Sequence, residues 1–164
     1  MQSDSKSVSR RTLLLSLTAL AACGFEPVYG PGGQAENLRG RIDIAAPEDE
    51  EGAALVERLE ERLGLPQGAD LGLTAQIYID EEALGFLRDG SISRYNVSGR
   101  VDWRLTRLDD GTEVLRGSER SFTSYAATST TVATITARRD ARRRLMVIIA
   151  DRILQDILLR ADTL

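Results

Sequence analysis

The stretch YNVSGRVDWRL, residues 95–105, decides the fold. Apolar or small side chains occupy every second position, and polar or charged side chains fill the positions between them. This period of two residues predicts a long β-strand with one apolar face and one charged face. The turn signal Asp109-Asp110-Gly111 follows, so residues 112–125 are predicted to return as the antiparallel partner. The alternation is broken in this second strand, and Gly117 is expected to mark a β-bulge.

Further strands are predicted upstream of this hairpin. Residues 71–79 alternate strictly between apolar and polar side chains, which predicts a half-buried strand. Residues 80–90 are either a loop or a continuation of that strand past a bend at Gly85. Asp89-Gly90 is a turn signal in either case. A short strand is expected from residue 38 to residue 45, where Ile and charged residues alternate.

Two segments repeat with the period of a helix. Residues 47–63 carry a leucine at every fourth position, with Pro47 and four acidic residues at the start and Gly64 just after the end. From about residue 130 to about residue 161, apolar residues recur every four positions without Gly or Pro. The second half of this long helix is richer in Ile and Leu and should make most of the core contacts. The element order predicts an α+β fold, β-α-β-β-β-α, with two helices packed on one face of a mainly antiparallel four-stranded sheet.

The N-terminus has the features of an export signal. Basic residues precede a short apolar run at residues 13–19, and the tetrapeptide Leu-Ala-Ala-Cys ends at Cys23. This tetrapeptide resembles a bacterial lipobox, in which Cys23 is lipidated and becomes the first mature residue. The alternative is an ordinary signal peptide followed by an incidental cysteine. The lipobox is favoured because Cys23 is the only cysteine of the chain and lies at the expected cleavage point.

These features divide the chain into three parts. Residues 1–22 are predicted to be a lipoprotein signal peptide, residues 23–37 an acylated linker, and residues 38–164 a single folded domain. In bacterial lipoproteins an aspartate after the cysteine resembles a signal for retention in the inner membrane. Gly24 occupies that position, which favours the outer membrane, with the domain on its periplasmic side. Residues 9–14 either resemble a twin-arginine export signal or simply supply positive charge.

Composition excludes several classes of function. The formal charge is −4, and removing three cations and one acid with residues 1–22 leaves the mature chain at −6. Such an acidic chain is not expected to bind nucleic acid. It has no histidine, and Lys6 is its only lysine, so Ser-His pairs, Ser-Lys dyads and Schiff-base lysines are excluded from the mature domain. A metal site built from His and Cys is also excluded, which leaves only oxygen ligands. We expect no enzyme activity, no bound metal and no cofactor other than a covalent lipid on Cys23, although a carboxylate-based hydrolase stays open.

Five arginines lie close together near the start of the long helix. They form either an anion-binding site, since guanidinium groups bind phosphates and carboxylates bidentately, or a solvated face paired with acidic residues. The second interpretation is favoured because the chain is rich in acids. The five are Arg138, Arg139, Arg142, Arg143 and Arg144.

Three motifs resemble the alphaproteobacterial members of the LptE family of lipopolysaccharide-assembly lipoproteins. They are CGFEPVY at residues 23–29, SFTSY at 121–125 and ARRDARRRL at 137–145. The order of elements matches over essentially the whole mature chain. The resemblance implies a non-catalytic protein that plugs the outer-membrane β-barrel LptD, assists its assembly, binds lipopolysaccharide and helps to transport and insert it. The alternative is a periplasm-facing adaptor lipoprotein that binds another envelope protein or peptidoglycan.

Lipopolysaccharide presents phosphates above a bed of acyl chains, so a protein that binds it needs guanidinium groups beside apolar surface. Arg88 and Arg94 flank the turn predicted at residues 89–90, close to Phe86 and Leu87. We expect these two arginines to contact lipid phosphate. The alternative is that they are ordinary exposed residues of a turn.

Overall fold

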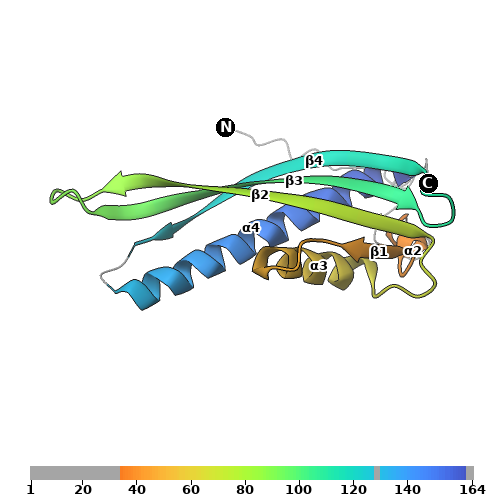
Figure 1. Ribbon diagram of the computed structural model, residues 1–164, viewed down its shortest axis with the longest axis horizontal. Coiled ribbons are helices and arrows are strands. Elements are labelled where there is room, and N and C mark those ends of the chain that lie inside the picture. The colour runs from red at the N-terminus through yellow and green to blue at the C-terminus, as the bar shows by residue number, and fades with distance from the viewer. Residues whose placement is uncertain (1–33, 128–129, 162–164) are drawn as a thin grey trace, which may run out of the picture.

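The computed structural model of the protein describes residues 34–127 and 130–161 (Figure 1). The predicted signal peptide, Cys23 and most of the predicted linker lie outside the described residues. The described elements are α2 (Gln34–Leu38), β1 (Ile42–Ala45), α3 (Glu50–Leu63), β2 (Leu71–Phe86), β3 (Ile92–Arg107), β4 (Glu113–Ala126) and α4 (Thr131–Leu159).

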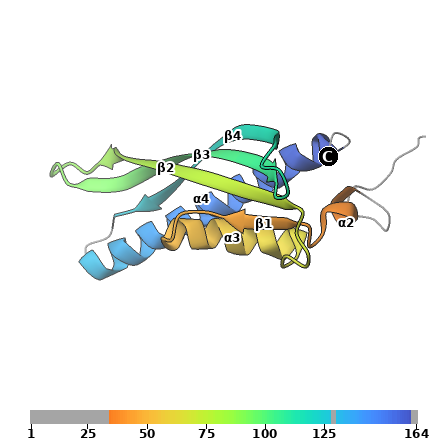
Figure 2. The ribbon, with the colours of Figure 1, turned by 45° about the vertical axis from the view of Figure 1, so that its right-hand side comes forward.

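The strands form one sheet in the order β1-β2-β3-β4. β1 is parallel to β2, whereas β2, β3 and β4 are successively antiparallel. α3 and α4 lie under the same face of the sheet in both views, and no described helix covers the opposite face, which is called the uncovered face below (Figures 1 and 2). The predicted α+β architecture is therefore confirmed.

The start of the domain differs from the prediction. The expected strand from residue 38 is only Ile42–Ala45, and the short helix α2 precedes it. Leu38 is buried at the end of α2, and Gly40 then turns the chain with a φ of 74° while its N–H donates to the carbonyl of Leu63 at 2.7 Å. A left-handed residue at this point is incompatible with a strand, so the strand begins only after it.

The predicted apolar face of β3 is buried in the structure. Val97, Val101, Trp103 and Leu105 are at most 1% exposed and face the helices. The predicted bulge at Gly117 is wrong, because Gly117 pairs in register with Trp103 and the irregularity lies two to four residues earlier in β4. A Cβ atom at Gly117 would lie 2.7 Å from the Trp103 indole ring. The glycine is needed so that the ring can lie flat on the neighbouring strand.

β2 settles the ambiguity over residues 80–90. The strand continues to Phe86 and remains paired with β3, with register shifts on either side of Gly85. The continuation interpretation is therefore the correct one. Figures 1 and 2 show the β2–β3 hairpin extending past the first turns of α4.

Both helices end close to their predicted limits. α3 starts at Glu50 rather than at Pro47, because Asp49 caps it by accepting a hydrogen bond from the N–H of Gly52 at 2.7 Å. The second half of α4 is almost entirely buried on its sheet side, as predicted. Ile148, which lies in the same half of α4, is 38% exposed and is not part of this buried side.

Candidate functional site

The tip of the β2–β3 hairpin is an exposed apolar surface with two arginines. Leu84, Phe86 and Leu87 are 62%, 66% and 56% exposed. Arg88 lies in the turn and Arg94 near the start of β3, and both are exposed. Within the described residues neither arginine forms an ion pair. Large apolar side chains beside uncompensated positive charge are unusual on a soluble domain and indicate a binding surface.

The turn itself is held by its own hydrogen bonds. The N–H of Leu87 donates to the carbonyl of Ser91 at 2.8 Å. The Asp89 carboxylate accepts from the Ser91 N–H at 3.0 Å and from its hydroxyl at 2.7 Å. These bonds lower the pKa of Asp89. The Asp89 carboxylate, the nearest acid in the sequence, is therefore held ionised in the turn by Ser91, and it forms no described ion pair with Arg88.

Arg94 lies on the uncovered face of the sheet. It pairs with Gly85 on β2 and with Ala126 on β4, so neither cross-strand neighbour offers a charge. The structure thus brings Arg88 and Arg94 to the same end of the hairpin, on either side of its turn. No described contact joins one arginine to the other.

The five arginines clustered at residues 138–144 of α4 are all paired with acidic residues, as the paired-face interpretation predicts. Four of the partners belong to α3 or β2, and one lies a single turn earlier on α4 itself. The pairs are Arg138–Glu81, Arg139–Glu50, Arg142–Glu51, Arg143–Glu57 and Arg144–Asp140. This cluster is therefore less suited to bind an external anion than the hairpin tip.

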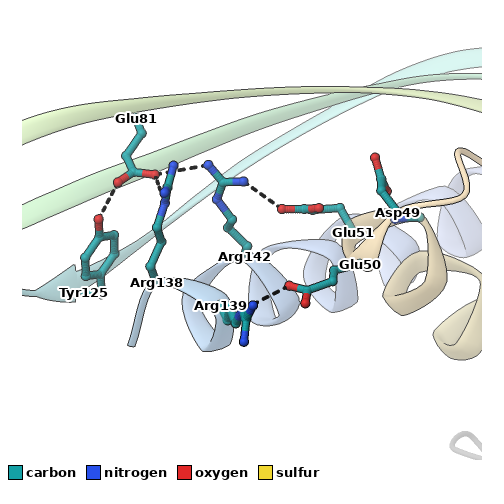
Figure 3. A network of polar contacts seen from close by, with 9 residues as sticks. Asp49, Glu50, Glu51, Glu81, Tyr125, Arg138, Arg139 and Arg142 are labelled. Atoms are coloured by element: carbon teal, nitrogen blue, oxygen red, sulfur yellow. Dashed lines mark hydrogen bonds and ion pairs between the residues drawn. The ribbon is translucent and has the colours of Figure 1, made fainter. Parts of the chain in front are cut away.

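Glu81 is the centre of a polar network under the base of the hairpin (Figure 3). Its carboxylate accepts hydrogen bonds from the Tyr125 hydroxyl, from Arg138 at 2.8 Å and from Arg142 at 3.2 Å. Arg142 also donates to Glu51 at 2.8 Å, which connects β2 and β4 to α4 and α3. The sequence analysis missed this network. The sequence feature that could have revealed it is Glu81 itself, an acidic residue at a position where the alternation of β2 otherwise places apolar, inward-facing side chains.

The ionisation of the network follows from its hydrogen bonds. Burial raises the pKa of Glu81, but the bonds from Tyr125, Arg138 and Arg142 outweigh it, and the pKa lies below its ordinary value. Burial and the bond to Glu81 raise the pKa of Tyr125 to about 12. The Tyr125 ring also stacks on Tyr95, with 5.1 Å between ring centroids. The base of the hairpin is thus fixed by charge and by aromatic packing, which gives the tip a defined position.

Residues 34–127 and 130–161 contain neither a helix that could span a membrane nor a cluster of side chains that could hold a metal ion. None of the helices there is both long enough and apolar enough to cross a membrane. No group of three or more His, Cys, Asp or Glu side chains within these ranges could hold a metal ion.

The family described as LptE, lipopolysaccharide-assembly, matches residues 40–157, well over half of the chain. The chain belongs to the LptE family. Members of the LptE family are non-enzymatic lipoproteins of the cell envelope that take part in lipopolysaccharide assembly and are not cofactor-binding proteins.

Solved structures share the fold of this LptE-family chain. A candidate lipoprotein from Caulobacter crescentus is 27% identical with a TM-score of 0.62, over 77% of this chain and 93% of that one. Rare lipoprotein B from Shewanella oneidensis is 16% identical with a TM-score of 0.53, over 71% and 92%. A minor lipoprotein from Acinetobacter baumannii is 14% identical with a TM-score of 0.54, over 73% and 90%. No curated protein matches the sequence.

Proposed function

We propose that this protein is a lipid-anchored LptE of the outer membrane, facing the periplasm. It plugs an LptD-type β-barrel, assists the assembly of that barrel, and takes part in the transport and insertion of lipopolysaccharide. The observation that carries the proposal, beyond family membership, is the apolar hairpin tip with two unpaired arginines.

The chemistry of the tip fits an anionic amphiphile. Phosphate groups of lipopolysaccharide would accept hydrogen bonds from Arg88 and Arg94, since guanidinium groups donate bidentately to such anions. Leu84, Phe86 and Leu87 would cover part of the acyl chains. Neither arginine has to break an ion pair within the described residues before it binds, in contrast to the arginines of α4.

The uncovered face of the sheet supports a place inside a barrel. It carries charged side chains of β3, among them Arg100, Asp102 and Arg104. The interior of a large outer-membrane barrel is polar and water-filled, so a polar sheet face can lie against it without burying unpaired apolar surface. A membrane-facing domain would instead need an apolar outer surface.

The anchor is proposed to be Cys23. Each buried methylene of an acyl chain contributes about 0.8 kcal/mol, and stable anchoring needs two chains. A diacylglycerol on the sulfur meets that requirement without a membrane-spanning segment. Metabolic labelling with a fatty acid should mark the wild-type chain and not Cys23→Ala, and label that persists on the variant would rule out the lipobox.

The central test is recovery of the chain from detergent-solubilised outer membranes. We expect a tagged chain to bring down a large β-barrel together with lipopolysaccharide. Recovery of a soluble envelope protein or of peptidoglycan fragments in place of the barrel would show that the chain is an adaptor lipoprotein instead.

A further inference from the structure

Arginine side chains from the middle of α4 to its C-terminal end occupy every second outward carbonyl along part of the outer edge of β4. Three arginines spaced eight residues apart, two on α4 and one at its C-cap, donate to three carbonyls spaced four residues apart on the strand. Eight helical residues rise about 12 Å, and four strand residues span about 13 Å, so the two spacings match. The bonds are Arg144 to Ser124 at 3.4 Å, Arg152 to Arg120, and Arg160 to Arg116 at 3.1 Å.

This arrangement protects one side of the sheet. An exposed edge strand offers a row of free backbone groups to which another chain can pair, and covering those groups prevents the pairing. The outward carbonyls of β4 at residues 116, 120 and 124 are already occupied. β4 is therefore a poor site for the addition of a strand.

The opposite side of the sheet is open along most of β2. β1 pairs only with Leu71–Thr74, and beyond that point no described strand lies beside β2. The carbonyl of Asp70 accepts from the N–H of Leu108, and the N–H of Leu71 donates to the carbonyl of Arg41. Even-numbered residues of β2 therefore direct their backbone groups toward β3, and odd-numbered residues direct theirs away from it.

The odd-numbered residues of β2 that follow the segment paired with β1 have backbone groups available to bond another strand. The N–H and C=O groups of Ile77, Ile79 and Glu81 point toward the open edge, and no described residue bonds to them. The side chains of Ile77 and Ile79 are half-buried on the helix side. On the uncovered side, Asp80 and Glu82 are exposed and have no ion pair within the described residues.

The negative charges of Asp80 and Glu82 determine which kind of strand can pair with the open edge of β2. A second copy of the chain paired through β2 would bring Asp80 and Glu82 near the same acids of its partner, and like charges across strands destabilise pairing. A strand with basic side chains on the uncovered side and apolar side chains next to Ile77 and Ile79 would be complementary. Strand addition of this kind gains affinity from backbone hydrogen bonds and specificity from alternate side chains.

We propose that β2, from Ile77 to Ala83, is a docking edge for an extended segment of a partner polypeptide. The segment pairs with β2 on the same side as β1, in the part of the edge that is open because β1 ends at Ala45. It carries basic residues opposite Asp80 and Glu82. The inference rests on the proposed function in one respect, since it identifies the partner as the outer-membrane barrel.

A proline at position 79 tests the proposal. Ile79→Pro removes an N–H that points to the open edge and leaves the β2–β3 hydrogen bonds intact, because proline is tolerated where the missing N–H faces outward. Ile79→Ala controls for the lost side chain. Phe122→Pro is the matched control on β4, where residue 122 also faces outward and lies between two carbonyls that arginines already occupy. Thermal unfolding by circular dichroism verifies that each variant folds.

We expect Ile79→Pro to reduce the barrel recovered from solubilised outer membranes by about tenfold, whereas both controls recover it as the wild type does. Hydrogen exchange on the wild-type complex is the second measurement and needs no variant. The amides of Ile77, Ile79 and Glu81 should exchange rapidly in the isolated chain and slowly in the complex. A complex that forms while these amides still exchange rapidly would overturn the docking edge and leave the proposed function standing. A wild-type chain that recovers no barrel would overturn both.

Discussion

Replacing Glu81 by Gln should destabilise the domain at neutral pH, because the carboxylate joins β2 to β4 and α4. The substitution keeps the size and one acceptor oxygen but removes the charge from three hydrogen bonds. Hydrogen bonds to charged groups contribute about 1.5–3 kcal/mol each. The bond from Arg138 is discounted because 48% of that side chain is exposed, whereas the side chains of Arg142 and Glu81 are 27% and 17% exposed. We expect a loss of about 2 kcal/mol, which corresponds to a melting temperature lower by about 4–8 °C.

The pH dependence of this loss has a definite sign. The pKa of Glu81 is lower in the folded chain than its ordinary value of 4.5. Its contribution is therefore fully present above that value and disappears as the pH falls through the folded pKa. Glu119 acts in the opposite direction, because burial and the nearby Asp156 raise its pKa. The quantity to follow is thus the difference between wild type and Glu81→Gln, in which the effect of Glu119 cancels.

Urea unfolding followed by circular dichroism, at several values between pH 7 and pH 3, gives this difference directly. It should be about 2 kcal/mol at pH 7 and should shrink toward pH 3. Glu82→Gln is the matched control, since Glu82 is the exposed neighbour and has no described ion pair. Equal stability of wild type and Glu81→Gln at pH 7, or a difference that does not change with pH, would refute the role given to the network.

Three further outcomes are expected. Gly117→Ala should cost about 2 kcal/mol of unfolding free energy, because its Cβ would lie 2.7 Å from a buried indole ring; an unchanged melting curve would contradict this packing. Ile153→Asp should abolish cooperative unfolding, since a fully buried position would receive an unpaired charge at a cost of several kcal/mol; a normal melt would disprove it. Arg88→Glu combined with Arg94→Glu should weaken lipopolysaccharide binding and reduce its salt dependence without changing the melting temperature. Equal binding by that double variant and the wild type at low salt would direct attention to the α4 arginines.

Local pattern was enough to predict the four strands and the helices α3 and α4, because each has one buried face, but it did not predict the short helix α2. The period of two in β3 and the period of four in α4 arise because each residue is buried or exposed according to which face of its own strand or helix it occupies. Boundaries failed where a single residue overrides the pattern. Gly40 delays β1 through its positive φ, and Asp49 delays α3 because its side chain caps the first turn.

The candidate site was only partly accessible to sequence reasoning. Arg88 and Arg94 were placed at the hairpin tip from neighbours in the sequence, since the turn between them is local. The Glu81 network joins residues 44 to 91 positions apart, and the arginines that reach the edge of β4 lie 20 to 44 positions from the carbonyls to which they donate. Such pairs depend on the register between elements, and hydrophobic pattern does not specify which charged side chain meets which partner.

The proposed lipid-binding tip and the proposed docking edge both belong to β2, and their independence can be measured. Seven residues separate Ile79 from Phe86, which is about 23 Å along a strand. Effects of substitutions more than about 7–10 Å apart usually add. Ile79→Pro should therefore reduce recovery of the barrel and leave lipopolysaccharide binding by the isolated chain unchanged, whereas charge reversal at Arg88 and Arg94 should do the opposite. If each change impaired both interactions, the hairpin would present one continuous surface to lipid and barrel together, and the division between tip and edge would be wrong.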